Sequence, residues 1–171
     1  MAERRSIADD ERYCHFVTFS CDRRRKLLEM EQPCRYLLGQ LNMQLQSHTA
    51  KCAGFVIMPN HVHFLIWLPE TGQLSSFLQN WKRLTSFQIR SWYEDHQSHY
   101  LKVSGPIDRL WTPKYYSVPI YSEVKLVQKL EYIHQNPVRA GLVDGPVDWK
   151  WSSARWYEQG KSVGVPIDWL F

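Results

Sequence analysis

The segment MPNHVHFLIWL, residues 58–68, decides how the rest of this sequence is interpreted. Successive side chains of a strand point to opposite faces, so His61 and His63 share one face and apolar residues line the other. Those apolar residues are Val62, Phe64, Ile66 and Leu68. Two adjacent imidazoles are half of a metal site, but two alternating histidines with no such role fit the same pattern. This segment alone leaves both interpretations open.

The flanking sequence predicts the order of the remaining elements. Strands are expected at 13–20, 52–58, 61–68 and 115–120, with a hairpin turn at Pro59-Asn60. Pro119 marks the last strand as an edge or an irregular strand. Apolar periodicity predicts helices at 31–48, 75–93 and 123–136, the last limited by Pro137, and residues 95–110 are expected to form a loop. On the helix at 75–93 we expect Leu78, Trp81, Leu84, Phe87 and Ile89 on the buried side. The order is β-α-β-β-α-β, the α+β pattern of a ferredoxin-like antiparallel sheet, followed by an added helix.

Length and composition indicate one globular domain over residues 1–171. Residues 1–11 are expected to form a loose N-terminal arm, and residues 145–171 a C-terminal extension on or beside a nucleic-acid-binding face. Hydrophobic residues make up 44% of the chain and charged residues 22%, which is ordinary for a globular protein. We find no apolar run of membrane-spanning length and no signal-peptide pattern, so we expect a cytoplasmic protein with no membrane partner. The four cysteines lack CxxC spacing and are expected to be reduced, packed thiols.

Cations stand beside aromatic residues at several places, although the net charge of +4 does not by itself prove nucleic-acid binding. Examples are WKR at 81–83, KYY at 114–116 and WKW at 149–151. Such pairs suit single-stranded nucleic acid, where bases stack and phosphates pair with cations. The RRRK cluster at 23–26 is either a solvated loop or a phosphate contact. The candidate DNA-binding residues are Arg23, Arg24, Arg25, Lys82, Arg83, Lys114, Lys129 and Arg139.

The helix at 123–136 carries a second set of polar groups. Leu126, Leu130 and Ile133 form its buried stripe, while Tyr132 and Asn136 lie one turn apart on a neighbouring face with Lys125 and Lys129. An exposed helix with a partly packed tyrosine would look the same. Together with His61 and His63, however, the amide of Asn136 could hold a divalent cation with neutral ligands, and Tyr132 could attack a phosphodiester.

These residues resemble a known family. The strand motif His61-Val62-His63 matches the signature of HUH endonucleases, and YIHQNPVRAGLV at 132–143 is similar to the signature of REP-associated tyrosine transposases, a branch of the single-tyrosine, IS200-like HUH transposases. HFVTF at 15–19, WTPKYY at 111–116 and WKWSSA at 149–154 agree, so the resemblance spans about residues 12–157. It implies Tyr132 as nucleophile, His61 and His63 as metal ligands, and Mg²⁺ or Mn²⁺ as the ion. Asn136 stands where the broader family often has a glutamine ligand.

The resemblance also implies the reaction. Such an enzyme cleaves single-stranded DNA at palindromic hairpins, forms a covalent 5′-phosphotyrosine intermediate, and rejoins the strand by the reverse step, as a monomer or a homodimer. No ATP is needed, and the sequence has no Walker motif.

Other classes of protein fit these motifs less well. Zinc hydrolases with a His-x-His strand would need further ligands or a longer chain, and the 132–143 signature argues against replication initiators and relaxases. Tyr115 and Tyr116 are rival nucleophiles, although packing or base stacking suits them better. A hairpin-DNA-binding protein that no longer cleaves stays the main alternative.

Overall fold

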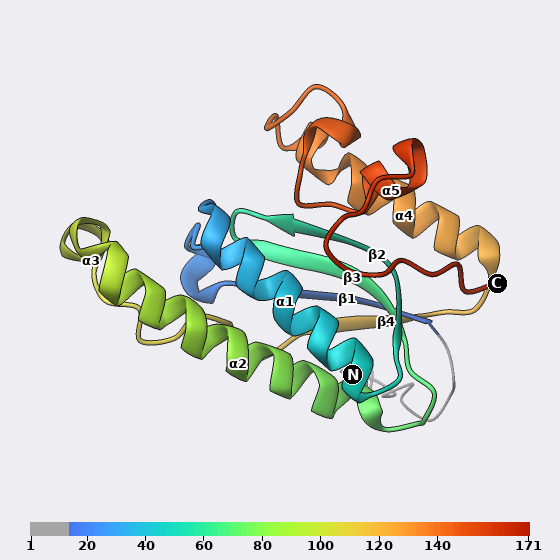
Figure 1. The fold of residues 1–171 in the computed structure, drawn as a ribbon, viewed down its shortest axis with the longest axis horizontal. Coiled ribbons are helices and arrows are strands. Elements are labelled where there is room, and N and C mark those ends of the chain that lie inside the picture. Colours follow the sequence, from blue (N-terminus) through green and yellow to red (C-terminus); the bar gives the residue numbers. More distant parts are fainter. Residues whose placement is uncertain (1–13) are drawn as a thin grey trace, which may run out of the picture.

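The computed structural model of this chain describes residues 14–171, and a four-stranded antiparallel sheet with the strand order β2-β3-β1-β4 lies at its centre (Figure 1). This is the order expected for a ferredoxin-like sheet, so the predicted fold class is confirmed. The predicted arm at 1–11 lies outside the described residues. The strands are β1 (Cys14–Ser20), β2 (Lys51–Met58), β3 (His61–Trp67) and β4 (Tyr116–Ile120).

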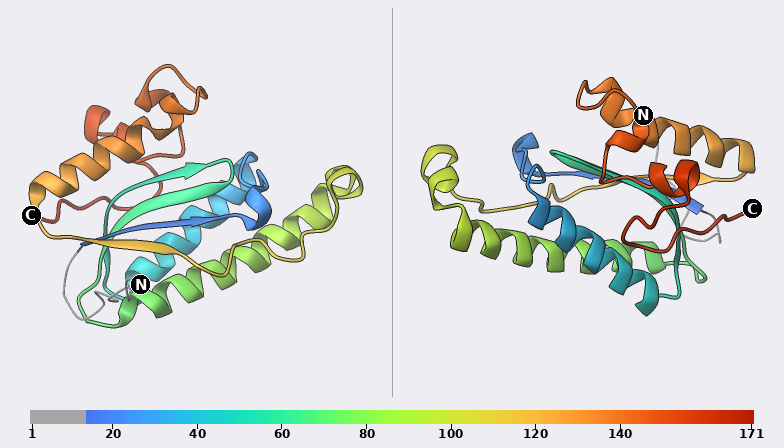
Figure 2. Two further views of the ribbon diagram at one scale, coloured as in Figure 1. Left: turned by 180° about the vertical axis from the view of Figure 1, so that it is seen from behind. Right: turned by 45° about the horizontal axis from the view of Figure 1, so that its top comes forward.

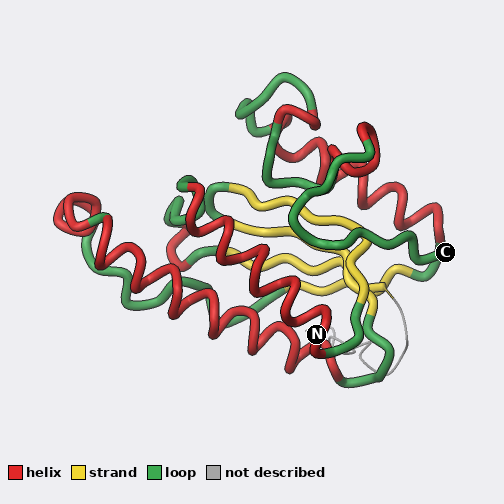
Figure 3. The backbone as a smooth tube through the Cα atoms, in the orientation of Figure 1, coloured by secondary structure: helices red, strands yellow, loops and turns green. Residues whose placement is uncertain are grey.

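Helices cover both faces of this sheet (Figures 2 and 3). On one face α1 (Glu31–Ser47) packs against α2 (Gln73–His96), and the short α3 (Ser98–Ser104) follows α2. On the other face lies α4 (Glu123–Arg139), the added helix of the prediction. Two 3-10 turns, at Asp22–Arg24 and Pro146–Asp148, and the helix α5 (Ala154–Gln159) complete the elements.

Strand alternation sorts the core into two clusters, one on each face of the sheet. Val62, Phe64 and Ile66 of β3 point toward α1 and α2 and are buried there, as predicted. Leu65 of the same strand belongs to the other cluster, with Phe16 of β1 and the α4 residues Leu126, Leu130 and Ile133. His61 and His63 therefore point toward the side of the sheet that α4 covers.

Three local details differ from the expectations. Leu78, Trp81 and Ile89 of α2 are buried as predicted, but Phe87 is 72% exposed, because the buried stripe passes through Thr85 between Trp81 and Ile89. The region 95–110, expected to be a loop, contains α3. Leu84, also expected on the buried side, is only half-buried.

The end of α4 also differs from the prediction. The helix runs through Pro137 and ends at Arg139, not at Asn136. Gly141 adopts a left-handed conformation with φ 73°, its N–H donates to the Val138 carbonyl, and the Leu142 N–H donates to the Pro137 carbonyl. These two bonds form a Schellman motif. A proline in the last turn removes a single backbone donor, so the glycine and not the proline ends the helix.

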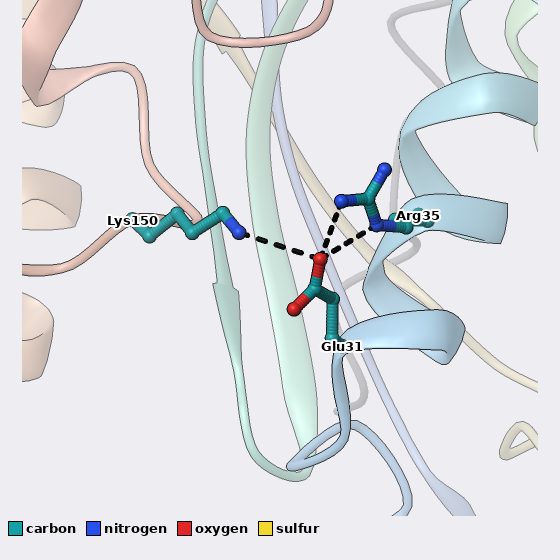
Figure 4. A network of polar contacts seen from close by, with 3 residues as sticks. All are labelled: Glu31, Arg35 and Lys150. Atoms are coloured by element: carbon teal, nitrogen blue, oxygen red, sulfur yellow. Dashed lines mark hydrogen bonds and ion pairs between the residues drawn. The ribbon is translucent and has the colours of Figure 1, made fainter.

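The C-terminal segment covers the outer edge of β2. The Ile57 N–H donates to the Trp151 carbonyl at 2.8 Å, and the Ser153 N–H donates to the Phe55 carbonyl at 3.0 Å. Lys150 of this segment lies 3.5 Å from the Glu31 carboxylate, which also accepts from Arg35 on α1 (Figure 4). These contacts tie residues 149–153 to the sheet and to α1. That the extension at 145–171 lies beside bound DNA stays a prediction.

Two further observations concern the cysteines and the helices. All four cysteines are buried free thiols, as predicted. Over residues 14–171 no helix has the length and apolarity needed to cross a membrane.

Candidate active site

His61 and His63 lie side by side on the α4 face of the sheet. In the register of β1 with β3, Ser20 is opposite His61 and Thr18 is opposite His63. The two imidazole centroids are 4.8 Å apart, and His63 is buried whereas His61 is half-buried. His61 and His63 therefore share one face of β3, as predicted, and their rings are close enough to bind one ion.

Each histidine uses its Nδ1 atom for a hydrogen bond inside the protein. Nδ1 of His61 donates to Oδ1 of Asn60 at 2.7 Å, and Nδ1 of His63 shares a hydrogen bond of 2.6 Å with the hydroxyl of Thr18. A partner on one ring nitrogen orients the ring and sets which nitrogen is free. Nε2 of each ring is thus the nitrogen left for a metal ion.

Both imidazoles are held in the neutral form. Burial lowers the pKa of His63 to about 3, with further lowering by His61, Lys129 and Arg139. Burial lowers the pKa of His61 to about 4, and Arg24 adds to that effect. Protons therefore do not compete for the Nε2 lone pairs at neutral pH, as metal ligation requires.

Tyr132 reaches the histidine pair from α4. Its ring centroid lies 5.7 Å from that of His63 and 6.1 Å from that of Phe16, and the residue is 44% exposed. The buried stripe of α4 faces the sheet, which turns the side chain of Tyr132 toward β3 and β1. A phenol and two imidazoles from distant parts of the sequence thus share one surface.

Two cations surround the phenol. Nζ of Lys129 lies 5.5 Å from the Tyr132 ring centroid and 4.5 Å from that of Phe16. The guanidinium of Arg139 lies 4.6 Å from the Tyr132 ring and donates to the Tyr132 carbonyl at 2.7 Å. The environment is therefore positive and suits an anionic ligand such as a phosphate.

Asn136 lies one helical turn beyond Tyr132 and is half-buried. Within residues 14–171 no group of three or more His, Cys, Asp or Glu side chains could hold a metal ion. A third protein ligand beside His61 and His63 would therefore come from another residue type. An amide oxygen of α4 is a chemically suitable one.

Sequence reasoning missed a pair of residues that anchors α4. Nε2 of His134 forms a 2.7 Å hydrogen bond with Oγ of Ser153, which also accepts from the Phe55 N–H at 3.0 Å. Ser153 thereby joins α4, β2 and the C-terminal segment in one buried network. The adjacent serines at 152–153 are both fully buried, but nothing local in the sequence signals their partners.

The predicted DNA-binding residues fall into different environments. Arg23 and Arg24 are exposed and have left-handed backbones, with φ of 54° and 57°. The side chain of Arg25 instead donates to the carbonyls of Pro106 and Gly105 at 2.7 and 3.0 Å. Arg25 therefore has a structural role, because its guanidinium holds the loop after α3.

The remaining cations are spread over both sides of the sheet. Lys82 donates to the Thr112 carbonyl at 2.7 Å, and together with Arg83 and Arg109 it lines a shallow hollow beside Trp111. Lys114 is exposed, just before β4. Only Lys129 and Arg139 contact the Tyr132 ring among the predicted DNA-binding residues in the described part of the chain.

Most of this chain is similar to proteins of one known family. The model of the family described as IS200-like transposases matches residues 10–136. A Haemophilus influenzae protein whose name places it among the REP-associated tyrosine transposases is 27% identical over 118 residues, which cover 66% of this chain and 62% of that protein. The REP-associated tyrosine transposase of Escherichia coli K12 is 24% identical over 116 residues, which cover 67% and 59%. The chain thus spans about three fifths of the length of these curated relatives.

Solved structures show the same fold. A REP-associated tyrosine transposase bound to a REP hairpin superposes with a TM-score of 0.67 at 22% identity, over 94% of this chain and 87% of that one. A Deinococcus radiodurans protein described as a transposase superposes with a TM-score of 0.50 at 17% identity, over 71% of this chain and 88% of that one. At these identities the likeness concerns the arrangement of the elements.

Proposed function

The chain belongs to the family of IS200-like transposases, and we propose that it cleaves and rejoins hairpin-forming single-stranded DNA through Tyr132. The observation that carries the proposal is the position of the Tyr132 ring, 5.7 Å from His63 on the same face of the sheet. The fold is also that of a solved transposase described as bound to a REP hairpin. We propose palindromic repeat DNA as the substrate for that reason.

Tyr132 is the proposed nucleophile. Its phenol oxygen attacks the phosphorus of one DNA linkage, an O–P bond forms, and the 3′ oxygen of the upstream nucleotide leaves to become a 3′-hydroxyl. Lys129 and Arg139, which both contact the ring, stabilise the negative charge that develops on the phenol oxygen. The product is a 5′-phosphotyrosine bond to the downstream strand.

Three neutral groups would hold a divalent cation in this site. We assign Nε2 of His61, Nε2 of His63 and the amide oxygen of Asn136 to it, with Mg²⁺ or Mn²⁺ as the ion. The donor set fits, because both imidazoles are neutral and have Nδ1 occupied by Asn60 and Thr18. When bound, the cation polarises the scissile phosphate and orients it for in-line displacement.

Rejoining is the same step in reverse. A 3′-hydroxyl attacks the phosphorus of the phosphotyrosine, the new O–P bond forms, and the oxygen of Tyr132 leaves. One phosphodiester is exchanged for another in each direction, so no nucleotide cofactor is consumed. This reversibility allows the enzyme to transfer a strand as well as to cut it.

The surrounding cations are proposed to hold the DNA backbone. Arg23 and Arg24 are both exposed, and Arg24 is close enough to His61 to lower its pKa, so we propose that this pair contacts phosphates that flank the cleaved one. Lys82, Arg83 and Lys114 would serve phosphates further away. Arg25 is the weakest candidate, because its guanidinium already donates to backbone carbonyls of the protein.

The test is a search for a covalent adduct. Hairpin oligonucleotides copied from palindromes that flank the gene are labelled at the 3′ end or at the 5′ end and incubated with Mg²⁺ or Mn²⁺. On a denaturing gel the 3′ label should migrate with the protein, and the 5′ label should be released on a shorter strand. Tyr132→Phe should abolish the adduct, whereas the matched control Tyr115→Phe, on the opposite face of the sheet, should keep it.

Other outcomes decide between the candidate functions. An adduct that persists in Tyr132→Phe would remove Tyr132 from the nucleophile role. If the parent and Tyr132→Phe both bind the hairpin and the parent never cleaves it, the chain is a non-cleaving hairpin-binding protein.

A further inference from the structure

The adjacent tyrosines Tyr115 and Tyr116 point to opposite faces of the sheet. Tyr115 packs against the cluster beneath α1 and α2, and its hydroxyl lies 3.4 Å from the hydroxyl of Ser75. Tyr116 is the first residue of β4 and is opposite Thr18 in the register of β1 with β4. Directly opposed residues of an antiparallel pair project on the same face. Tyr116 therefore projects on the face that holds Thr18, His63 and Tyr132.

Tyr116 lies in one row with the histidine site. Thr18 is opposite Tyr116 on one side and opposite His63 on the other. Neighbouring strands are about 5 Å apart, so the backbones of His63 and Tyr116 are separated by about 10 Å. Thr18, the residue between them, is the one whose hydroxyl engages Nδ1 of His63. The ring of Tyr116 thus borders the proposed scissile phosphate at the distance of a neighbouring nucleotide.

The ring of Tyr116 is largely open to solvent. The residue is 53% exposed, and within residues 14–171 its side chain has no hydrogen bond or ring contact. α4 begins just after β4 but runs away from it, across the same face of the sheet, toward β2 at the opposite edge (Figures 1 and 2). α4 therefore lies over the part of this face near the end of β4, and Tyr116 at the beginning of that strand stays exposed.

The geometry points to Tyr116 as a stacking surface for a base of the cleaved strand, next to the scissile phosphate. This inference rests on the proposed function, which puts that phosphate at His61 and His63. Exposed aromatic rings on a sheet face bind unpaired bases by stacking, with little dependence on base identity. Tyr116 would hold the nucleotide whose phosphate Tyr132 attacks, or the one beside it, so that the strand lies flat across β1 and β4.

Charge on the same face favours a nucleotide as the occupant. Phe16, whose ring lies 4.5 Å from Nζ of Lys129, is opposite Val118, two residues along β4 from Tyr116. Lys114 is exposed just before the strand. A single exposed aromatic residue is ordinary on a protein surface. An exposed ring in register with His63, on the face that also carries Lys129, is suited to a base that is linked to phosphates.

The test measures binding without cleavage. All proteins carry Tyr132→Phe and are kept in EDTA, and their Kd for a hairpin oligonucleotide with a single-stranded flank is measured by fluorescence anisotropy. Tyr116→Ala should weaken binding by between about fivefold and 150-fold, the range that loss of one stacked base implies. Tyr116→Phe and Tyr116→Trp, which keep a flat ring, should bind within about threefold of the parent. Phe87→Ala, an exposed aromatic on α2, is the matched control and should have no effect.

An abasic scan identifies the stacked base. An abasic site is placed at each position of the single-stranded flank in turn. At one position the parent should lose affinity and the penalty of Tyr116→Ala should disappear, because the base that would stack is absent. A penalty that stays the same at every position, or a Tyr116→Ala protein that binds as well as the parent, would overturn the inference.

These outcomes are separable from those of the proposed function. If Tyr116→Ala weakens hairpin binding as expected but the wild-type chain forms no adduct in the cleavage assay, the proposed chemistry alone is overturned. If the wild-type chain forms the adduct but Tyr116→Ala has no effect on Kd, the stacking alone is overturned. A parent that binds no hairpin at all would overturn both.

Discussion

Gly54 decides how closely α4 can approach the sheet, and Gly54→Ala tests that packing. A Cβ atom at this position would lie 2.4 Å from Cδ2 of Leu130 and 3.0 Å from Oγ of Ser153. The φ angle of Gly54 is not positive, so alanine meets no backbone penalty and the effect is one of packing. The added methyl group therefore clashes with the helix that carries Tyr132.

The magnitude follows from which neighbour can move. Oγ of Ser153 is held by the Phe55 N–H and by His134, so Leu130 must change its rotamer or α4 must shift. Overpacking a core by one methyl group costs about 1–3 kcal/mol. Replacing glycine stabilises a protein by about 0.4–1 kcal/mol through the unfolded chain. The packing penalty should win, and we expect a net loss of about 1–2 kcal/mol in the free energy of unfolding.

The measurement is a double-mutant cycle in urea. Leu130→Ala alone removes a buried side chain and should cost about 2–5 kcal/mol. In the double variant the methyl group introduced by Gly54→Ala no longer meets the leucine side chain, so the combined loss should be smaller than the sum by at least about 1 kcal/mol. A Gly54→Ala protein as stable as the parent, or strictly additive losses, would refute the packing argument. The adduct assay adds a second readout, since a displaced Tyr132 should react more slowly.

Three further predictions concern the groups around the site. Thr18→Val should weaken Mn²⁺ binding by about 10–100-fold in calorimetric titration because His63 loses the partner of its Nδ1, whereas Thr18→Ser should retain most of the affinity. Burial lowers the pKa of His134 to about 4, so between that value and about 6.5 the unfolded chain binds a proton that the folded protein does not. Stability should therefore fall as the pH is lowered through this window, and His134→Gln should reduce the slope of unfolding free energy against pH by up to about 1.4 kcal/mol per pH unit; an unchanged slope would contradict the burial of a neutral imidazole. Arg25→Ala should lower the urea midpoint of unfolding, because the carbonyls of Gly105 and Pro106 lose their hydrogen-bond donor. Arg23→Ala should leave that midpoint unchanged and should reduce the salt dependence of hairpin binding. If Arg23→Ala lowered the midpoint and Arg25→Ala changed only the salt dependence, Arg23 would be the structural residue and Arg25 the phosphate contact.

Local patterns were sufficient for the four strands and the helices α1, α2 and α4, and for the face to which most of their side chains point, although they missed α3. The alternation at 61–68 correctly divides the histidines from the apolar residues, because a strand has a period of two whatever it packs against. Pro119 correctly marks β4 as an edge strand, since an edge tolerates a missing donor. The same reasoning failed for Phe87, where several helical stripes are apolar enough to be buried and only the shape of α1 and the sheet selects one.

Contacts between distant segments could not be read from such patterns. Arg25 looked like part of a phosphate-binding cluster, but carbonyls of Gly105 and Pro106, about 80 residues later, occupy its guanidinium. His134 and Ser153 gave no signal at all, although they fasten α4 to β2. A hydrogen bond of this kind depends on which loops meet in space, and no spacing along the chain encodes it.

The repeat of a single strand or helix is enough to establish the order of the four strands and of α1, α2 and α4, the common face of His61 and His63, and the helical spacing of Tyr132 and Asn136. Packing alone establishes that α4 crosses the histidine face, that the Tyr132 ring lies 5.7 Å from His63, and that Tyr116 is in the same row as both Thr18 and His63. These positions could not be predicted because a site shared by several elements depends on how those elements meet. Here that meeting is set by the strand register, by the absence of a side chain at Gly54 and by the buried hydrogen bonds of Ser153.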